Sequence, residues 1–262
     1  MSETLSAPAK AAGPLLRNSI AVASGKGGVG KTWLSITICH VMAKRGMKVL
    51  LFDGDLGLAN IDIQLGLAPD RDLGGVLAGR YLLRDATERY AEGGFDVIAG
   101  RSGSGTLAGM PSEQLARLGA GLAQIAPAYD RIVLDLGAGV ERTVREFAAL
   151  SKTCLVIATD EPTAMTDAYA FIKLSRMHNP TGDLRLVINM APSRNDGERT
   201  YATLRKACQS FLKTAPPLAG VIRRDPKVRE AIRHQTSLLV RHPNTLAASD
   251  VEALVQRLTE AS

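Results

Sequence analysis

The sequence predicts an α/β fold in three layers, with a mostly parallel central sheet of about seven or eight strands flanked by helices. Two observations lead to this prediction. Short apolar runs such as VLLF, RIVL and CLVIA lack polar alternation, which is typical of strands covered on both faces. Longer amphipathic segments separate these runs, and such alternation favours right-handed βαβ units. The length of 262 residues suits one domain of this kind.

Each element follows from its local pattern. Apolar runs predict strands at residues 20–23, 48–53, 95–99, 131–135, 154–159, 184–189 and 218–222. Helical periodicity predicts helices at residues 31–44, 112–125, 140–150, 163–177, 197–212 and 245–258. Residues 1–18, rich in Ala, Ser and Pro, are predicted to form a flexible tail, and residues 19–262 the single domain.

Composition excludes several classes of protein. No run of about 18 apolar residues occurs, so no membrane span is predicted. The N-terminal stretch lacks a basic start followed by an apolar run, so no secretory signal is predicted either. Cys39, Cys154 and Cys208 are far apart and form no CxxC pair, which argues against a disulfide framework and against an iron–sulfur site. We therefore expect a protein of the reducing cytoplasm.

A phosphate-binding motif follows the first predicted strand. The motif GxxxxGK[ST] is matched in full by Gly25, Lys26, Gly27, Gly28, Val29, Gly30, Lys31 and Thr32. Glycines let successive N–H groups point at phosphate oxygens, and the positive end of the next helix faces them. Lys31 is expected to reach the β- and γ-phosphates, and the Thr32 hydroxyl to coordinate Mg²⁺. The sequence therefore predicts a P-loop NTPase fold that binds a nucleoside triphosphate and Mg²⁺.

Carboxylates follow two other predicted strands. Asp53 and Asp55 end the second strand, and Asp135 ends the fourth in the arrangement known as Walker B. Facing a phosphate cradle, such carboxylates suit a cation or an attacking water. We expect Asp53 and Asp135 to join Thr32 at the metal, and Asp55 to orient the water. For Asp62 a helix-capping role is favoured over a catalytic one.

A second lysine inside the loop, Lys26 in KGGVGKT, makes the chain resemble the MinD/ParA family of deviant Walker A P-loop ATPases, of the SIMIBI class. The segment DGDLGLANID at residues 53–62 most resembles the flagellar branch of that family, FlhG/FleN. The resemblance implies that Lys26 reaches the partner's ATP across a homodimer interface, and that Asp55 is the catalytic aspartate. It implies slow hydrolysis in which Lys26 and Lys31 neutralise phosphate charge. Trp33 replaces a small hydroxyl residue; packing under the helix is favoured over stacking on the nucleotide.

The resemblance also implies contacts with the base. Asn189 matches an asparagine that reads the adenine edge, and GVIRRD at residues 220–225 matches a loop that wraps the base. Arg223 stands there in place of a proline, and Asp225 closes the segment. At Leu136 the family usually has a hydroxyl residue.

For function, the resemblance implies an ATP-dependent dimerising switch that controls the number or placement of flagella or of another polar assembly. Its implied partners are an SRP-type flagellar GTPase, a flagellar transcription activator and switch-ring proteins. The implied location is cytoplasmic, at a pole or peripheral to the inner membrane. An apolar face near the C-terminus is interpreted as core packing rather than membrane binding, and its residues are Val251, Leu254, Val255 and Leu258.

A second functional class stays open. From Arg185 onward the chain has 13 basic and 7 acidic residues, a difference equal to the whole net charge of +6. Such a surface suits an acidic partner such as nucleic acid. The alternative is thus a ParA-like partitioning ATPase whose ATP dimer binds DNA nonspecifically, with a steep dependence on salt.

Overall fold

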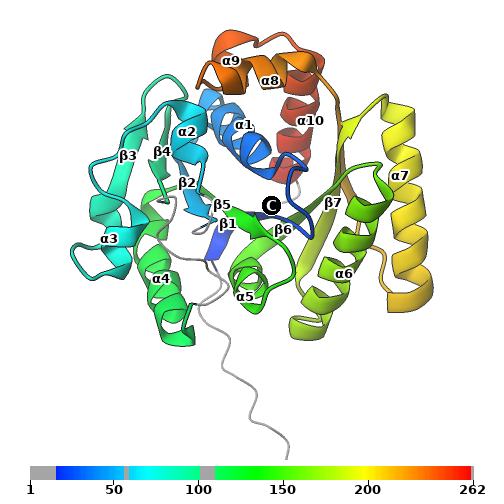
Figure 1. Cartoon of the computed structure of the whole chain (residues 1–262), viewed down its shortest axis with the longest axis horizontal. Helices are drawn as coiled ribbons and strands as arrows, with labels where there is room; N and C mark the ends of the chain where they lie inside the picture. Colours follow the sequence, from blue (N-terminus) through cyan, green and yellow to red (C-terminus); the bar gives the residue numbers. More distant parts are fainter. Residues whose placement is uncertain (1–15, 56–58, 101–109, 261–262) are drawn as a thin grey trace, which may run out of the picture.

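The computed structural model describes residues 16–55, 59–100 and 110–260. It contains an eight-stranded sheet in the order β3-β4-β2-β5-β1-β6-β7-β8 (Figure 1). The strands are β1 (Leu16–Ser24), β2 (Val49–Gly54), β3 (Thr87–Tyr90), β4 (Phe95–Ile98), β5 (Arg131–Ala138), β6 (Ser151–Ala158), β7 (Asp183–Ala191) and β8 (Leu218–Arg223). Every pairing is parallel except that of β3 with β4. The predicted fold class is confirmed.

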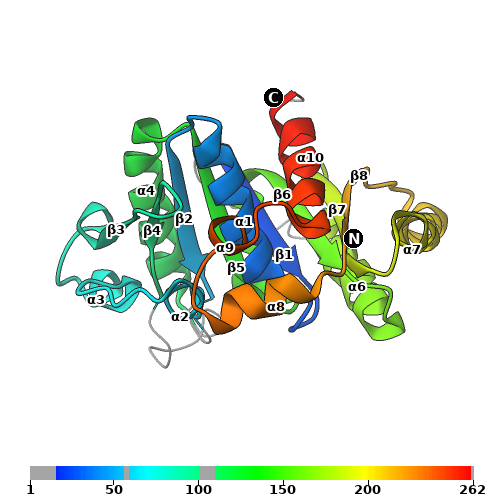
Figure 2. The same cartoon turned by 90° about the horizontal axis from the view of Figure 1, so that it is seen from above.

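Helices cover both faces of this sheet (Figures 1 and 2). The longer ones are α1 (Lys31–Lys44), α4 (Ser112–Ile125), α5 (Arg142–Leu150), α6 (Pro162–His178), α7 (Arg194–Ala207) and α10 (Leu246–Glu260). The shorter ones are α2 (Ile61–Leu65), α3 (Leu73–Leu77), α8 (Pro226–Arg233) and α9 (Leu238–Arg241), with the 3₁₀ turns η1 (Leu83–Ala86) and η3 (Ala126–Ala128) and the π-helical turn η4 (Cys208–Leu212). Helices α1 and α4 have the predicted bounds.

Short elements were not predicted. Strand β3 has the sequence TERY, and as an edge strand it pairs only with β4, so it has no long apolar run to signal it. An ion pair of 2.9 Å between Arg89 and Asp96 supports this edge. Helices α2, α3, α8 and α9 have eight residues or fewer, which is too short for a clear 3.6-residue period.

The predicted tail boundary at residue 18 needs a correction, because β1 already begins at Leu16. Leu16 is buried and pairs with Ser151 of β6. The Asn18 amide donates hydrogen bonds of 2.9 and 2.7 Å to the carbonyls of Ala126 and Tyr129. Residues 16–18 therefore belong to the domain, and residues 1–15 lie outside the described part of the chain.

The hydrophobic core has two parts, one on each face of the sheet. In the part beneath α1, helix α10 packs against α1 and β8. The apolar face predicted at the C-terminus is buried there, with Val251, Leu254 and Val255 fully covered and Leu258 6% exposed. Core packing of this face is confirmed. Within the described residues, no helix has the length and apolar character needed to cross a membrane.

A buried histidine in this core gives the domain a pH-dependent stability. His40 of α1 is 5% exposed, and its Nδ1 lies 2.7 Å from the Ser237 hydroxyl. Burial, and then the nearby charge of Lys44, lower the pKa of His40 to about 4. Because the unfolded chain binds this proton near pH 6.5, stability present above that pH is lost as the pH falls toward 4.

We expect the free energy of unfolding to fall by about 1.5 kcal/mol between pH 6.5 and pH 5 through this one group. Urea unfolding at both pH values measures the change. His40→Gln should remove most of it, while His178→Gln, which changes an exposed histidine of α6, should retain it. An unchanged pH dependence in His40→Gln would assign the effect to other groups.

Candidate nucleotide-binding site

The phosphate loop lies between β1 and α1, at the carboxyl ends of the central strands. Gly28 and Gly30 have φ of 78° and 88°, a left-handed backbone that glycine adopts without strain. Helix α1 begins directly after Gly30, with no side-chain cap and no acidic residue in its first turn. Its first N–H groups thus have no side-chain acceptor at the cap and suit an external anion.

Close packing fixes the position of this loop. A Cβ atom on Gly25 would collide with the backbone carbonyl of Asp167 in α6. A Cβ atom on Gly30 would collide with the Asn189 amide from the end of β7. At Gly28, by contrast, a Cβ atom would meet no other atom within 4 Å, so the loop is open on that side. The open side is where phosphates would lie.

Polar side chains of α1 converge on Asp135. The Ser35 hydroxyl donates a 2.9 Å hydrogen bond to the Asp135 carboxylate, and Thr32 makes a second one. Burial raises the pKa of Asp135 to about 6, an effect that these two hydrogen bonds and the charge of Lys31 partly offset. Lys31 is 8% exposed; burial lowers its pKa, against the attraction of Asp135 and Asp55. The predicted lysine, hydroxyl and Walker B carboxylate therefore lie together.

The carboxylates of β2 complete the group. Asp53 pairs with Asp135 in the register of β2 with β5. Burial, and then the charge of Asp135, raise the pKa of Asp53 well above its usual value. The backbone N–H groups of Asp55 and Ile61 donate to it at 3.0 and 3.4 Å. A Cβ on Gly137, near the end of β5, would lie 3.5 Å from the Asp55 carboxylate, so the Asp55 side chain lies beside this end of β5.

These donors fit a magnesium ion held together with phosphates. No cluster of three or more His, Cys, Asp or Glu side chains in the described ranges can hold a metal alone. Mg²⁺ normally takes one or two protein oxygens and fills its octahedron with water and substrate phosphate. The partly buried Thr32 hydroxyl and two buried carboxylates with raised pKa values, next to an open anion cradle, match that donor set. Thr32, Asp53 and Asp135 thus stay the predicted metal ligands.

The second lysine of the loop is held within its own chain. Lys26 Nζ lies 2.8 Å from Glu161 Oε2 and 2.8 Å from Thr163 Oγ1, at the start of α6. The Lys26 side chain is 37% exposed and that of Glu161 64% exposed, so this ion pair contributes little to stability and can exchange. The Lys26 ammonium therefore faces solvent at the edge of the phosphate loop. Its predicted reach to a partner's nucleotide stays a prediction.

The residues predicted to contact the base have different partners in the structure. Asn189 is buried, and its amide donates a 2.8 Å hydrogen bond to the carbonyl of Val29 in the phosphate loop. Asn189 thus lies against the loop. Asp225 accepts from the Lys227 N–H at 2.9 Å and caps α8.

Arg223 departs from its predicted position on the base. Its guanidinium makes two hydrogen bonds of 2.8 Å to Asp250 of α10, which is 2% exposed. The buried carboxylate requires this cation, so the Arg223 side chain is directed at α10. Any contact of Arg223 itself with a base would come from its backbone.

Three other sequence predictions can be compared with the structure. Trp33 is 6% exposed in the core beneath α1, which supports packing over stacking. Leu136 is buried in the opposite core, where a hydroxyl would be costly. Asp62 lies in the first turn of α2 rather than at its cap, which is Asn60, and its carboxylate accepts from the Ile63 N–H. Residues 56–58 of the DGDLGLANID segment lie outside the described residues.

Sequence reasoning assigned no role to three residues that position the site: Ser35, Glu161 and Asp250. For Ser35 a signal existed, because it lies one helical turn after Lys31 and so faces the same side. Glu161 and Asp250 are far along the chain from their partners Lys26 and Arg223, and no local sequence pattern predicts such pairs.

Comparisons with known proteins agree with this geometry. A family model described as the CobQ/CobB/MinD/ParA nucleotide binding domain matches residues 20–238. The chain is 37% identical over 239 residues to the antiactivator FleN of Pseudomonas aeruginosa, covering 91% of this chain and 85% of that protein. It is 30% identical over 236 residues to the flagellum site-determining protein YlxH of Helicobacter pylori, covering 90% and 79%. The solved cell division ATPase MinD of Pyrococcus furiosus has a TM-score of 0.76 at 23% identity, covering 94% and 99%.

Proposed function

Because this chain belongs to the CobQ/CobB/MinD/ParA family of nucleotide-binding domains, we propose that it is an ATP-dependent dimerising switch that hydrolyses ATP slowly and controls the number or placement of flagella. The observation that carries the ATPase part is the convergence of Lys31 and Thr32 with Asp53, Asp55 and Asp135 at one edge of the sheet. The flagellar part is supported by the identity to FleN and YlxH over most of the chain.

Each residue has a distinct task in the proposed reaction. The N–H groups of the phosphate loop and Lys31 bind the phosphates and offset their charge. Thr32, Asp53 and Asp135 would hold Mg²⁺, which neutralises charge on the β- and γ-phosphates when bound. Asp55, which packs beside Gly137, would orient the attacking water. Little covalent chemistry is required of the protein, so positioning and electrostatics supply the rate.

Dimerisation would use Lys26. To reach a partner's phosphates it must leave Glu161 and Thr163, and its partly exposed position makes that exchange inexpensive. ATP supplies the triphosphate that replaces these acceptors. The dimer would then recruit partners, for which we retain an SRP-type GTPase, a transcription activator and switch-ring proteins, and hydrolysis would disperse it.

Light scattering tests this mechanism. With Mg²⁺ and ATP or a non-hydrolysable analogue, we expect twice the monomer mass, and with ADP or no nucleotide the monomer mass. Lys26→Ala should stay monomeric in every case, since the charge that crosses the interface is gone. Lys173→Ala removes an exposed lysine of α6 and should dimerise normally. A monomer under all conditions would refute the dimer for the isolated protein.

The flagellar part has its own test. Expression of this chain in Pseudomonas aeruginosa cells that lack FleN should restore the normal number of flagella. Lys26→Ala should fail to do so. Restoration by the monomeric variant would separate flagellar control from dimerisation.

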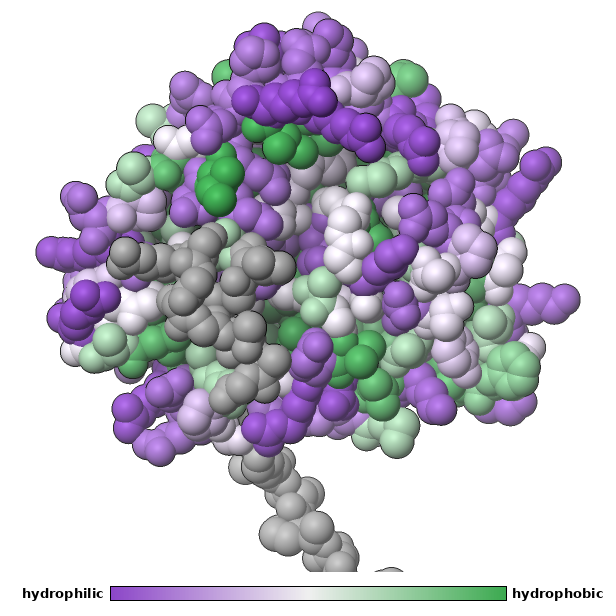
Figure 3. All heavy atoms as spheres, viewed as in Figure 1, coloured by the Kyte–Doolittle hydropathy of each residue, from purple (hydrophilic) through white to green (hydrophobic). Residues whose placement is uncertain are grey.

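The alternative of DNA binding has one supporting observation. Hydrophilic side chains cover the molecule where α8 lies (Figures 1 and 3), and this helix presents Lys227, Arg229 and Arg233. DNA and liposome sedimentation with ATP at several salt concentrations distinguishes the candidates. Binding to DNA that falls steeply with salt would favour the partitioning function. Binding to neither would favour a switch that acts on proteins alone.

A further inference from the structure

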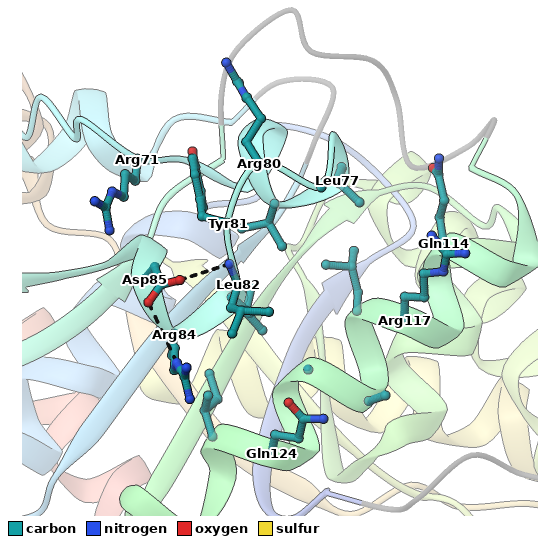
Figure 4. Close-up of a pocket in the computed structure, with 17 residues that line it drawn as sticks. Arg71, Leu77, Arg80, Tyr81, Leu82, Arg84, Asp85, Gln114, Arg117 and Gln124 are labelled. Atoms are coloured by element: carbon teal, nitrogen blue, oxygen red, sulfur yellow. Dashed lines mark hydrogen bonds and ion pairs between the residues drawn. The ribbon is translucent and has the colours of Figure 1, made fainter.

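A groove lies on the far side of the sheet from α1, and none of its lining residues belongs to the nucleotide site. It is bounded by α4 on one side and by α3, the segment 78–82 and η1 on the other, and its volume is about 810 Å³ (Figure 4). Its lining includes the apolar residues Val76, Leu77, Leu83, Leu118 and Ile125. On the rim, Leu82 is 56% exposed.

The wall formed by α3 and the following segment is rigid. The Tyr81 hydroxyl donates to the Asp72 carbonyl at 2.9 Å and accepts from the Asp72 N–H at 2.8 Å. A Cβ on Gly75 would collide with the Tyr81 ring, so the two residues are in tight contact. The Asp72 carboxylate caps α3 through the Gly75 N–H. A groove with a fixed wall needs little ordering when a ligand binds.

The opposite wall is the length of α4. A Cβ on Gly121 of α4 would lie 3.3 Å from Leu83, so η1 approaches this helix closely. The lining residues of α4 run from Gln114 to Ile125, a distance of about 16 Å along the helix axis. The groove is therefore as long as a partner helix of about three turns.

The rim is strongly basic. Arg71, Arg80, Arg84 and Arg117 line the groove, and Asp85 is the single acid among the lining residues. Asp85 already accepts the Leu82 N–H at 3.0 Å. Four guanidinium groups against one engaged carboxylate make the groove complementary to a negatively charged ligand.

These arginines are available to a ligand. The Arg80 guanidinium has no hydrogen bond or ion pair with any other residue that the structure describes. Arg117 and Glu113 form an ion pair whose two side chains are each 76% exposed, and Arg84 approaches Asp85 only to 3.8 Å. Such exposed pairs contribute little and are readily exchanged. Arg71 lies over the Tyr81 ring, 5.8 Å from its centroid.

The arrangement of the arginines indicates the shape of the ligand. In Figure 4 Arg71, Arg80, Arg84 and Arg117 lie at separate corners of the groove and do not converge on one point. A single phosphate or a compact nucleotide would need converging donors. Charges spread around an elongated apolar floor instead match an amphipathic helix, with apolar residues on one face and acidic residues along its edges.

We propose that this groove binds an acidic amphipathic helix of a partner protein, with the helix lying along α4. Its apolar face would contact the exposed Leu82 and the partly buried Leu77 and Ile125, and its flanking carboxylates would pair with the arginines. This goes beyond the ATP-driven switch, since it assigns a binding surface outside the nucleotide site. No step of it requires nucleotide.

The test uses the full chain and a fluorescent peptide of about three turns, with leucines along one face and glutamates on both sides. A peptide with lysines in place of the glutamates, and an acidic one scrambled so that the leucines share no face, serve as comparisons. Fluorescence anisotropy measures each affinity. The acidic amphipathic peptide alone should bind with measurable affinity.

Variants locate the binding. Arg80→Glu with Arg117→Glu should weaken binding about tenfold or more, because two attractive pairs become repulsive. Arg205→Glu with Arg229→Glu changes the net charge equally on α7 and α8 and should have no effect. Leu82→Ser should weaken binding without a change in charge. All these side chains are exposed, so thermal unfolding should stay as in the wild type.

Several results would overturn the proposal. They are no binding of the acidic helix, equal binding of the scrambled peptide, or equal losses in the groove and control variants. Displacement of the peptide by short duplex DNA, together with equal binding of the scrambled peptide, would show a general polyanion surface. A change in molar mass caused by the groove variants would show an interface between copies of this chain.

Discussion

Lys31→Met is expected to reduce ATP hydrolysis about 10²- to 10³-fold and to weaken ATP binding about 10- to 100-fold. Lys31 is the first residue of α1 and is 8% exposed, next to the N–H groups that form the phosphate cradle. A charge-assisted hydrogen bond to a phosphate contributes about 1.5–3 kcal/mol to binding. In the transition state the charge on the phosphate oxygens is redistributed, so the loss in rate exceeds the loss in affinity.

The variant should fold normally, which makes its loss of activity interpretable. Burial lowers the pKa of Lys31, so the charged ammonium is less favourable in the fold than in water despite Asp135 and Asp55. A folded-state pKa below the unfolded value means that this charge subtracts stability at neutral pH. Methionine fills a similar volume without a charge, and unfolding in the absence of nucleotide should occur at the wild-type temperature or above it.

Calorimetric titration with Mg-ATP and a phosphate-release assay measure the two effects. Lys44→Met is the matched control, because it makes the same change at the exposed end of the same helix. It should bind and hydrolyse ATP as the wild type does. Wild-type affinity in Lys31→Met would mean that the loop does not bind the phosphates, and the proposed function would fail with it.

The central strands and the phosphate loop could be predicted because their signals are local. The run VLLF needs no partner to indicate a buried strand, and β2 lies where it predicts. The motif GKGGVGKT needs glycine where the backbone is left-handed, and Gly28 and Gly30 indeed have positive φ. Strands of a parallel sheet end at one edge, so the convergence of Asp53 and Asp135 follows from their positions in sequence.

What could not be predicted depends on side-chain direction and distant contacts. Arg223 was expected at the base, yet Asp250, 27 residues further on, is buried and draws its guanidinium to α10. Lys26 and Glu161 are 135 residues apart, and only the close approach of α6 to the loop at Gly25 brings them together. The groove beside α4 likewise depends on where α3 and η1 pack. These two elements are too short for their sequences to show a helical hydrophobic period, so their positions could not be predicted.

Asp55→Asn is expected to reduce ATP hydrolysis about 10²-fold or more while ATP binding stays close to that of the wild type. Asparagine has nearly the same shape, and the backbone N–H of residue 55 can still donate to Asp53. What is lost is the negative oxygen that would accept a hydrogen bond from the attacking water. The charge of Asp55 also raises the pKa of Asp135 and of Asp53, so its removal relieves repulsion among buried carboxylates.

Single-turnover hydrolysis and nucleotide titration on the same preparation separate chemistry from binding. Asp62→Asn is the matched control: it changes a carboxylate of the same segment that accepts from the Ile63 N–H, and it should hydrolyse ATP normally. Because Asp55→Asn binds ATP without consuming it, its ATP dimer should persist where that of the wild type decays. Wild-type hydrolysis in Asp55→Asn would place the water-orienting group elsewhere, whereas loss of binding would make Asp55 part of the metal site beside Asp53 and Asp135.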